Sequence, residues 1–301
     1  MSNAPSETFG AGDSFLLLDF LPLADDAFAR LLHESDAPGM WQRMRHHGND
    51  VPRLVSMQAC HRLDEQGRQC IPIYRHPAEE QPDARPFVPC LEDARKRLNE
   101  VLPQQQQQSV CFNHAIVQQY RDGQDFIGAH VDKSIDIVQG TPICNLSLGA
   151  QRTLVLRNKV QPKLVQRIPL PHNSVFVLGW QTNREWTHEI RADKRPRCEK
   201  NAQELAYAGV RISATLRCIG TFLLSCVPMM MIYGQGATSK IAPGNRVMSA
   251  TTDELALVQE QQRLLLHAFA AENRETAFDW AAHYGAGFDV LDLAALLNEQ
   301  K

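Results

Sequence analysis

The sequence contains no Cys-x-x-Cys pair, although it has eight cysteines. Structural zinc sites and thioredoxin-like redox sites are commonly built on that spacing, so its absence disfavours both. The thiols are instead expected to be reduced and packed inside the protein, in a reducing compartment. Cys60, His61 and Cys70 form an alternative group that would ligate a metal.

Long hydrophobic runs are also absent. The longest apolar segment, residues 222–233, contains Pro228 and is shorter than the ~20 residues that cross a bilayer, so it is interpreted as a core strand. The first residues, Met1–Glu7, lack the basic flank and cleavage pattern of a secretory signal. We therefore expect an intracellular protein, in the cytoplasm or the nucleus, without a membrane partner.

The sequence has no excess of positive charge, because 31 Lys and Arg face 34 Asp and Glu, for a net charge of −3. Nucleic-acid binders gain much of their affinity from basic residues, so composition gives little support to such a partner. One basic cluster surrounds His188: Arg184, Arg191, Lys194, Arg195, Arg197 and Lys200. It is either a phosphate-contacting lip over an active site or a solvated loop between strands.

Two histidines and one aspartate, His130, Asp132 and His188, are the most informative residues present. Two imidazoles and one carboxylate can bind one face of Fe(II) and leave the opposite face open. Residues two apart on a strand point to the same side, so His130 and Asp132 can reach one metal. His188 lies within Trp186–Ile190, whose alternating pattern predicts another strand.

Arg211 opens the segment Arg211–Arg217, downstream of the candidate metal ligands. A guanidinium can hold a carboxylate through two charge-assisted hydrogen bonds, and it stays charged at any working pH. A dicarboxylate cosubstrate needs such a partner. Together with the candidate ligands, Arg211 therefore suggests Fe(II) and 2-oxoglutarate as cofactors.

Six blocks of sequence, in one order, resemble the AlkB family of Fe(II)- and 2-oxoglutarate-dependent dioxygenases. The blocks are Tyr120–Gly123, Ile127–Asp132, Leu146–Gly149 with Arg152, Asn173–Gly179, Trp186–His188 and Arg211–Arg217. A weaker resemblance extends upstream to about residue 50. Residues 132–138 and 149–152 are similar to fungal members of the family.

The resemblance implies that His130, Asp132 and His188 bind iron and that O2 is the second substrate. Arg211 would hold the distal carboxylate of 2-oxoglutarate, and Arg217 would lie beside the other end of the cosubstrate.

Three further residues are implied near the cosubstrate. Tyr120 would hydrogen-bond close to the cosubstrate or the substrate. Family members usually carry asparagines where this sequence has Gln118 and Ser213. Both replacements keep a hydrogen-bonding side chain, so cosubstrate binding is expected to be retained.

An enzyme of this kind hydroxylates a C–H bond through a ferryl intermediate, and the resemblance favours oxidative demethylation of N-alkylated bases in DNA or RNA. Members that act on nucleobases commonly have an acidic residue two positions after the metal aspartate, where this sequence has Ser134 and the next acid is Asp136. This departure and the low charge leave a small-molecule tailoring oxygenase, acting on an amino acid or secondary metabolite in a fungus, as the alternative. The complete ligand set argues against a binding protein that has lost its chemistry.

Periodicity and the resemblance together predict an α+β, mainly β, protein in three parts. Residues 1–110 would form an N-terminal extension with a strand at 15–20, helices at 25–33 and 91–101, and substrate-recognition residues around Met57 or Tyr74. Residues 111–226 would form a double-stranded β-helix, or jelly-roll, core. Residues 227–301 would form a helical C-terminal extension with a capping box at Thr251–Glu254, and the glutamine run 104–108 would be a surface loop.

Overall fold

The computed structural model describes residues 7–34, 40–46, 49–78, 83–102, 110–248, 255–291 and 293. Residues 1–6, the glutamine run 104–108 and the capping box expected at 251–254 lie outside the described residues. Within the described part of the chain, no helix has the length and the apolar character needed to cross a membrane.

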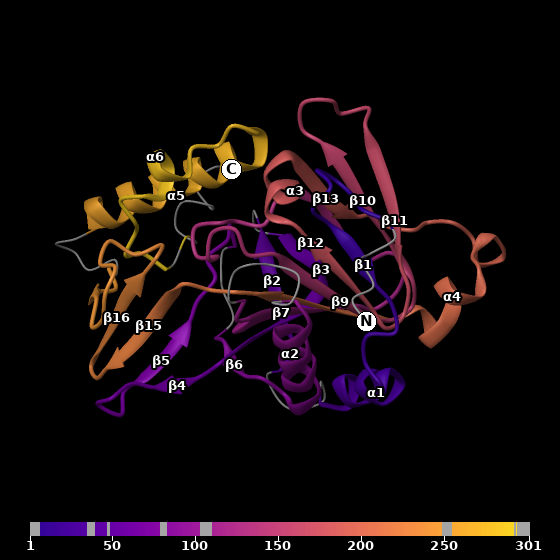
Figure 1. Ribbon diagram of the computed structural model, residues 1–301, viewed down its shortest axis with the longest axis horizontal. Helices are drawn as coiled ribbons and strands as arrows, with labels where there is room; N and C mark the ends of the chain where they lie inside the picture. Colours follow the sequence, from indigo (N-terminus) through magenta and orange to yellow (C-terminus); the bar gives the residue numbers. More distant parts are fainter. Residues whose placement is uncertain are drawn as a thin grey trace.

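Two facing sheets form the centre of the molecule (Figure 1). The larger contains, in spatial order, β1 (Phe15–Leu17), β12 (Ser174–Leu178), β9 (Ile143–Gly149), β14 (Arg211–Arg217), β7 (His114–Tyr120), β3 (Asn49–Ala59) and β2 (Gln42–His46), with β6 (Arg85–Pro86) beside β3. The smaller contains β11 (Val165–Leu170), β10 (Arg152–Asn158), β13 (Trp186–Ile190) and β8 (Ile127–His130). Apart from the parallel pair of β3 and β6, the pairings are antiparallel. The predicted mainly β, jelly-roll class is confirmed.

The alternation of side chains along the strands divides the larger sheet into two faces. On β14, Ile212, Ala214 and Leu216 point to the outer face, where they join one hydrophobic cluster. Arg211 and Arg217 point the other way, toward the smaller sheet, and line a cavity. The sequence Arg-Ile-Ser-Ala-Thr-Leu-Arg therefore places its polar residues inside the barrel because side chains alternate with a period of two.

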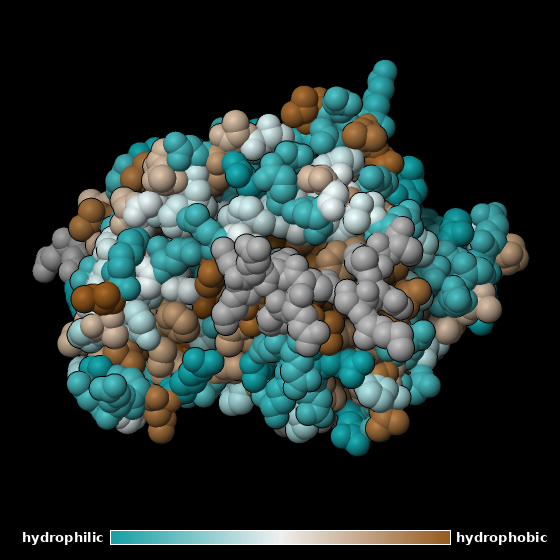
Figure 2. All heavy atoms as spheres, in the orientation of Figure 1, coloured by the Kyte–Doolittle hydropathy of each residue, from teal (hydrophilic) through white to brown (hydrophobic). Residues whose placement is uncertain are grey.

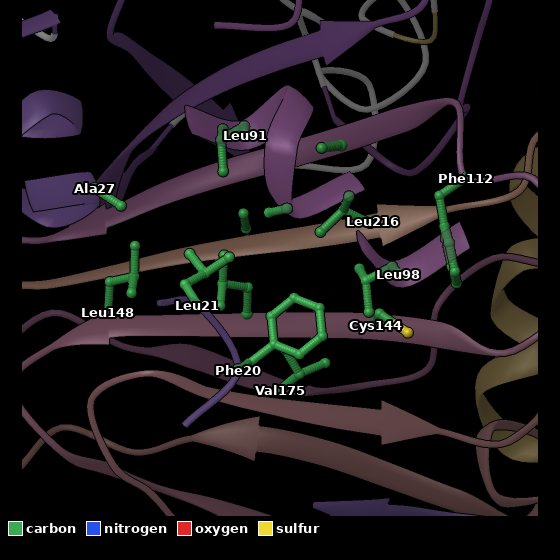
Figure 3. Packing of buried hydrophobic residues seen from close by; sticks show 14 of the residues in the cluster. Phe20, Leu21, Ala27, Leu91, Leu98, Phe112, Cys144, Leu148, Val175 and Leu216 are labelled. Carbon is green, nitrogen blue, oxygen red and sulfur yellow. The ribbon is translucent and has the colours of Figure 1, made fainter. Parts of the chain in front are cut away.

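Two helices cover the outer face of the larger sheet. They are α1 (Ala24–Glu34) and α2 (Pro89–Val101), close to the helices expected at 25–33 and 91–101. Figure 3 shows Leu91 and Leu98 of α2 among side chains of the sheet such as Leu148. Helix α2 begins earlier than expected because Pro89 suits the first turn, where no backbone N–H is needed for the helix.

A further sheet lies beside the barrel. It contains, in spatial order, β17 (Asn245–Arg246), β16 (Met229–Gly234), β15 (Thr221–Cys226), β5 (Gln69–Pro72) and β4 (Arg62–Leu63). The prediction that residues 222–233 form one core strand is wrong, because they form the β15–β16 hairpin. The chain turns at Val227 and Pro228, where Val227 is 90% exposed. Proline has no N–H for a ladder, so it ends the first strand.

The C-terminal extension packs against the barrel through its own hydrophobic cluster. Its helices are α5 (Leu255–Arg274) and α6 (Trp280–Tyr284), drawn in yellow in Figure 1. Leu265, Phe269 and Tyr284 pack there with Ile135, which follows β8 in the sequence. The division of the chain at residues 110 and 226 stays a prediction. Strands from both sides of residue 110 share the larger sheet.

Four short helical turns complete the described elements. They are α3 (Trp180–Glu185), η1 (Arg197–Glu199), α4 (Ala202–Leu205) and η2 (Ala206–Gly209).

Candidate metal centre and cosubstrate cavity

His130 and His188 lie opposite each other on neighbouring strands. His130 ends β8 and pairs in register with His188 of β13, and the two ring centroids are 4.3 Å apart. The Nδ1 atom of His130 lies 2.7 Å from the carbonyl oxygen of Gly128. A proton on Nδ1 would donate to that carbonyl and leave the lone pair of Nε2 available to a metal.

Asp132 completes the cluster from the segment after β8, and not from within a strand as expected. Its Oδ1 lies 3.9 Å from Nε2 of His130 and 4.0 Å from Nε2 of His188. Its Oδ2 accepts from Nη2 of Arg217 at 2.8 Å. The carboxylate therefore has one oxygen held by an arginine and the other facing both imidazoles.

The ligand atoms of His130, Asp132 and His188 all lie within 4.8 Å of one another. No other group of three or more His, Cys, Asp or Glu side chains in the described residues is as close together. The alternative group is not brought together. The Sγ of Cys70 contacts the hydroxyl of Tyr233 at 3.0 Å, and Nε2 of His61 lies 2.8 Å from the carbonyl of Ala84. All eight cysteines lie in the described residues and are free thiols.

The protonation states in the cluster suit metal binding. Burial, together with nearby His188, lowers the pKa of His130 to about 3. Burial also lowers the pKa of His188. For Asp132 burial alone would raise the pKa, but Arg217 and the histidines outweigh it and lower the pKa to about 2. Two neutral imidazoles and one carboxylate at neutral pH are the donor set that Fe(II) needs.

Arg211 lies across the cavity on the larger sheet and is 1% exposed. Its Nη2 donates to Oδ1 of Asn145 at 3.0 Å and to Oγ of Ser147 at 2.8 Å. Its Nε and Nη1 are buried and have no hydrogen-bond partner among the described residues. A buried cation with unused donors is costly unless an acceptor reaches it, so this site fits the carboxylate of a cosubstrate.

A single cavity contains the predicted metal and cosubstrate site. Its lining includes every residue predicted to bind the metal or the cosubstrate: Gln118, Tyr120, His130, Asp132, His188, Arg211, Ser213 and Arg217. The hydroxyl of Tyr120 donates to Oε1 of Gln118 at 3.1 Å, and its ring lies 5.1 Å from the guanidinium carbon of Arg211. Gln118 and Ser213 thus lie on the cavity wall as expected.

Two polar residues on β9 that belong to the site were missed by the sequence reasoning. Asn145 donates to Oγ of Ser213 at 2.7 Å and to Oγ1 of Thr215 at 2.9 Å, and it lines the cavity. Ser147 follows it on β9 and holds Arg211. Polar residues at alternate positions of an otherwise apolar strand were the available signal.

Asn183 of α3 was also missed, because its contact spans 51 residues of sequence. Its Oδ1 accepts from the backbone N–H of Asp132 at 3.0 Å, and its Nδ2 donates to the carbonyl of Asp132 at 2.8 Å. The backbone of the candidate ligand is therefore fixed by a paired hydrogen bond.

The region expected to recognise substrate lies beside Arg217. The guanidinium carbon of Arg217 is 4.1 Å from the ring centroid of Tyr74, and Tyr74 stacks on His76 at 5.5 Å. Met57 is buried in the same hydrophobic cluster as Tyr74. Arg217, expected next to the cosubstrate, thus contacts both the candidate metal ligand and an aromatic wall.

Three of the six residues of the basic cluster around His188, namely Arg191, Arg195 and Lys200, form ion pairs with acids. Arg195 contacts Asp193 at 2.9 Å and Glu204 at 2.6 Å, and Arg191 contacts Glu189 at 2.6 Å. The lobe that carries α4 is mostly hydrophilic on the face seen in Figure 2. These pairs favour the interpretation as a solvated loop over that of a phosphate-contacting lip.

Comparison with known families identifies the class of protein. The model of the 2OG-Fe(II) oxygenase superfamily matches residues 16–217, which include all the candidate site residues. The chain therefore belongs to the 2OG-Fe(II) oxygenase superfamily. Membership implies Fe(II), 2-oxoglutarate and O2 as cofactors.

Among curated proteins, the chain is 36% identical over 118 residues to the DNA oxidative demethylase ALKBH2 of Mus musculus, an alignment covering 37% of this chain and 47% of the relative. For ALKBH2 of Homo sapiens the identity is 32% over 118 residues, covering 37% of this chain and 43% of the relative. The chain thus spans less than half the length of these relatives. The AlkB-like resemblance is confirmed, whereas the fungal type stays a prediction.

Two solved structures align with part of this chain. The structure of OsALKBH1 has a TM-score of 0.45 and 17% identity, and the alignment covers 72% of this chain and 100% of that one. A prolyl hydroxylase from Trichoplax adhaerens has a TM-score of 0.41 and 12% identity, covering 69% of this chain and 83% of that one.

Proposed function

We propose that the protein is an Fe(II)- and 2-oxoglutarate-dependent dioxygenase that removes alkyl groups from nucleobase nitrogens by oxidation. The observation that carries the proposal is one cavity containing both His130, Asp132 and His188 and the unused donors of Arg211. The similarity to relatives named as DNA oxidative demethylases supports a nucleobase as the substrate.

The residues that would bind iron and those that would bind 2-oxoglutarate lie on opposite sides of the cavity. His130, Asp132 and His188 hold the iron, and Arg211 binds the distal carboxylate of 2-oxoglutarate. Bound iron would supply the oxidation chemistry, in which one oxygen atom of O2 enters succinate as 2-oxoglutarate loses CO2 and the other is inserted into a substrate C–H bond. On an N-methyl group the hydroxylated product releases formaldehyde.

Other side chains orient these groups and exclude water. Arg217 keeps Oδ2 of Asp132 occupied, so only Oδ1 faces the histidines. Tyr120, Gln118 and Ser213 offer hydrogen-bonding groups along the cosubstrate. Apolar side chains, including Ile116, Leu154, Leu170, Phe176, Leu178 and Ile190, line the rest of the cavity.

A flipped or single-stranded base is the substrate that we assign to the aromatic wall. Enzymes that act on bases commonly hold the base by stacking on aromatic side chains. Tyr74 is 3% exposed and stacks on His76 at 5.5 Å, so the base would stack on the half-buried ring of His76, while Tyr74 lies over Arg217 beside the candidate metal ligand. Alkylated DNA or RNA is therefore the proposed partner. The eight free thiols support an intracellular location.

The decisive experiment measures succinate and formaldehyde together. The protein would be incubated in air with Fe(II), 2-oxoglutarate and a single-stranded oligonucleotide carrying N1-methyladenine or N3-methylcytosine, beside the unmethylated strand. Formaldehyde equal to succinate on the methylated strand alone is expected. Equal succinate on both strands without formaldehyde would show a working iron centre with another substrate, such as a small molecule.

Ionic strength separates the same alternatives independently. Activity on an oligonucleotide should fall steeply as salt rises, because binding releases counterions from the phosphates. Turnover of a small neutral molecule should change little over the same range.

The iron ligands have a direct test. His130→Ala, Asp132→Ala and His188→Ala are each expected to abolish 2-oxoglutarate turnover, because a facial set of three has no spare ligand. Full activity in any one of these variants would remove that residue from the ligand set.

A further inference from the structure

The C-terminal extension forms hydrogen bonds with three residues near Asp132, namely Val131, Lys133 and Ser134. The backbone N–H of Val131 donates to Oδ1 of Asn273 at 3.2 Å. The Nζ of Lys133 donates to the same Oδ1 at 2.6 Å and to the carbonyl of Phe269 at 3.1 Å. Residues on both sides of the candidate metal ligand are therefore held by α5.

Ser134 is held by Glu272, the residue before Asn273 on the same helix. Its backbone N–H donates to Oε1 of Glu272 at 3.0 Å, and its hydroxyl donates to the same oxygen. The other oxygen of Glu272 accepts from the hydroxyl of Tyr284 at 2.7 Å. From α6, Nε1 of Trp280 donates to the carbonyl of Ser134 at 3.2 Å.

The hydrogen bonds from Ser134 to Glu272 are buried and those to Asn273 are partly buried, and both helix residues lie beyond the matched family region. Ser134 is 3% exposed, Lys133 2% and Glu272 5%. Hydrogen bonds of this kind fix geometry because the buried groups have no water to replace a lost partner. The family match ends at residue 217, whereas α5 begins at Leu255. The contacts therefore come from a part of the chain that the family model does not include.

We propose that Asn273 and Glu272 are positioning residues for the candidate metal ligand Asp132, so that the C-terminal extension is part of the metal site. Arg217 holds the side chain of Asp132, Asn183 holds its backbone, and α5 holds its neighbours. The inference rests on the proposed function only in requiring that the cluster binds a divalent metal. Groups that orient metal ligands typically change metal affinity by about 10- to 100-fold when removed.

The test is a calorimetric titration of the full chain with Mn(II), without 2-oxoglutarate, in the parent and in four variants. Asn273→Ala removes the acceptor shared by Val131 and Lys133, and we expect a loss of Mn(II) affinity of about 10-fold or more. Asn273→Asp keeps an oxygen in the same place and should restore most of the affinity. Ser134→Ala keeps the backbone donor but removes the hydroxyl and should give an intermediate loss.

Glu260→Gln is the matched control, because Glu260 lies on the same helix, is exposed and pairs with Arg263. It should bind Mn(II) like the parent. Circular dichroism would show whether each variant is folded, and hydrogen exchange of residues 131–134 should be faster in Asn273→Ala than in Glu260→Gln. A general loss of stability would speed exchange throughout the protein, so faster exchange confined to residues 131–134 would indicate a local loss of order.

The outcomes separate this inference from the proposed function. If the parent does not bind Mn(II), the metal site itself is wrong and both fail. If the parent binds Mn(II), while folded Asn273→Ala binds it within about twofold and exchanges residues 131–134 at the parent's rate, the positioning role fails and the metal site stands.

Discussion

Arg75 joins three distant segments of the chain, since it contacts Asp136, Gly236 and Phe288. It is 1% exposed and forms an ion pair with Asp136, which is fully buried, at 2.7 Å. Its Nε and Nη2 donate to the two oxygens of Asp136 at 3.1 and 2.7 Å. Nη1 donates to the carbonyls of Phe288 and Val290, and Nη2 also donates to the carbonyl of Gly236. All the donors of this guanidinium are therefore used.

Arg75→Met should destabilise the protein by about 3–5 kcal/mol, because it leaves a carboxylate buried without its cation. Three carbonyls lose a donor as well. A loss of that size corresponds to a fall in melting temperature on the order of 10 °C for a chain of this length. Urea unfolding followed by tryptophan fluorescence would measure the change in the free energy of unfolding.

Two further variants make the measurement decisive. Arg263→Met removes an exposed ion pair, with side chains 49% and 48% exposed, and should cost less than about 0.5 kcal/mol. Replacing Arg75 by Met and Asp136 by Leu together should recover part of the loss, because no charge is then left unpaired. An Arg75→Met variant within about 1 kcal/mol of the parent would refute the reasoning.

Two other predictions concern the cosubstrate and pH. Arg211→Ala should raise the Michaelis constant for 2-oxoglutarate by about 10- to 100-fold, since a charge-assisted hydrogen bond contributes roughly 1.5–3 kcal/mol, and an unchanged constant in a succinate assay would contradict the assignment. His114 is buried, with no hydrogen-bond partner for either ring nitrogen among the described residues, and burial lowers its pKa well below 6.5. As pH falls below about 6.5, His114 binds a proton in the unfolded chain but stays neutral in the folded protein. The free energy of unfolding therefore falls by about 1.4 kcal/mol per pH unit. His114→Phe should reduce the slope of stability against pH by that amount between about pH 6.5 and pH 5, and equal slopes in urea unfolding would show that His114 does not act this way.

The sequence predicts those parts of the site whose side-chain direction follows from alternation along a strand. His130, His188, Arg211 and Ser213 lie on strands, and their spacing alone fixes which side of each strand they occupy. Asp132 lies just beyond its strand, yet it reaches the same point because Arg217 and Asn183 hold it there.

The contacts that were missed are those that no local pattern encodes. Glu272 lies 138 residues from Ser134, and nothing in the periodicity of α5 marks that carboxylate as a buried partner. Asp136 was noted only as the next acid after Ser134, whereas its role is to pair with Arg75. The prediction of a single strand at 222–233 is wrong because Pro228, although noted, was not interpreted as the turn of a hairpin.

The division of the cavity between two sheets has a consequence for chain-length selectivity. His130 and His188 lie on the smaller sheet and Arg211 on the larger, and packed sheets lie about 10 Å apart. A dicarboxylate that bridges them must match that gap. Leu156 and Ile168 fill the space between the sheets without lining the cavity. Substitutions that change their size would thus alter the preference between 2-oxoglutarate and a shorter 2-oxo diacid such as oxaloacetate, although neither residue lines the cavity.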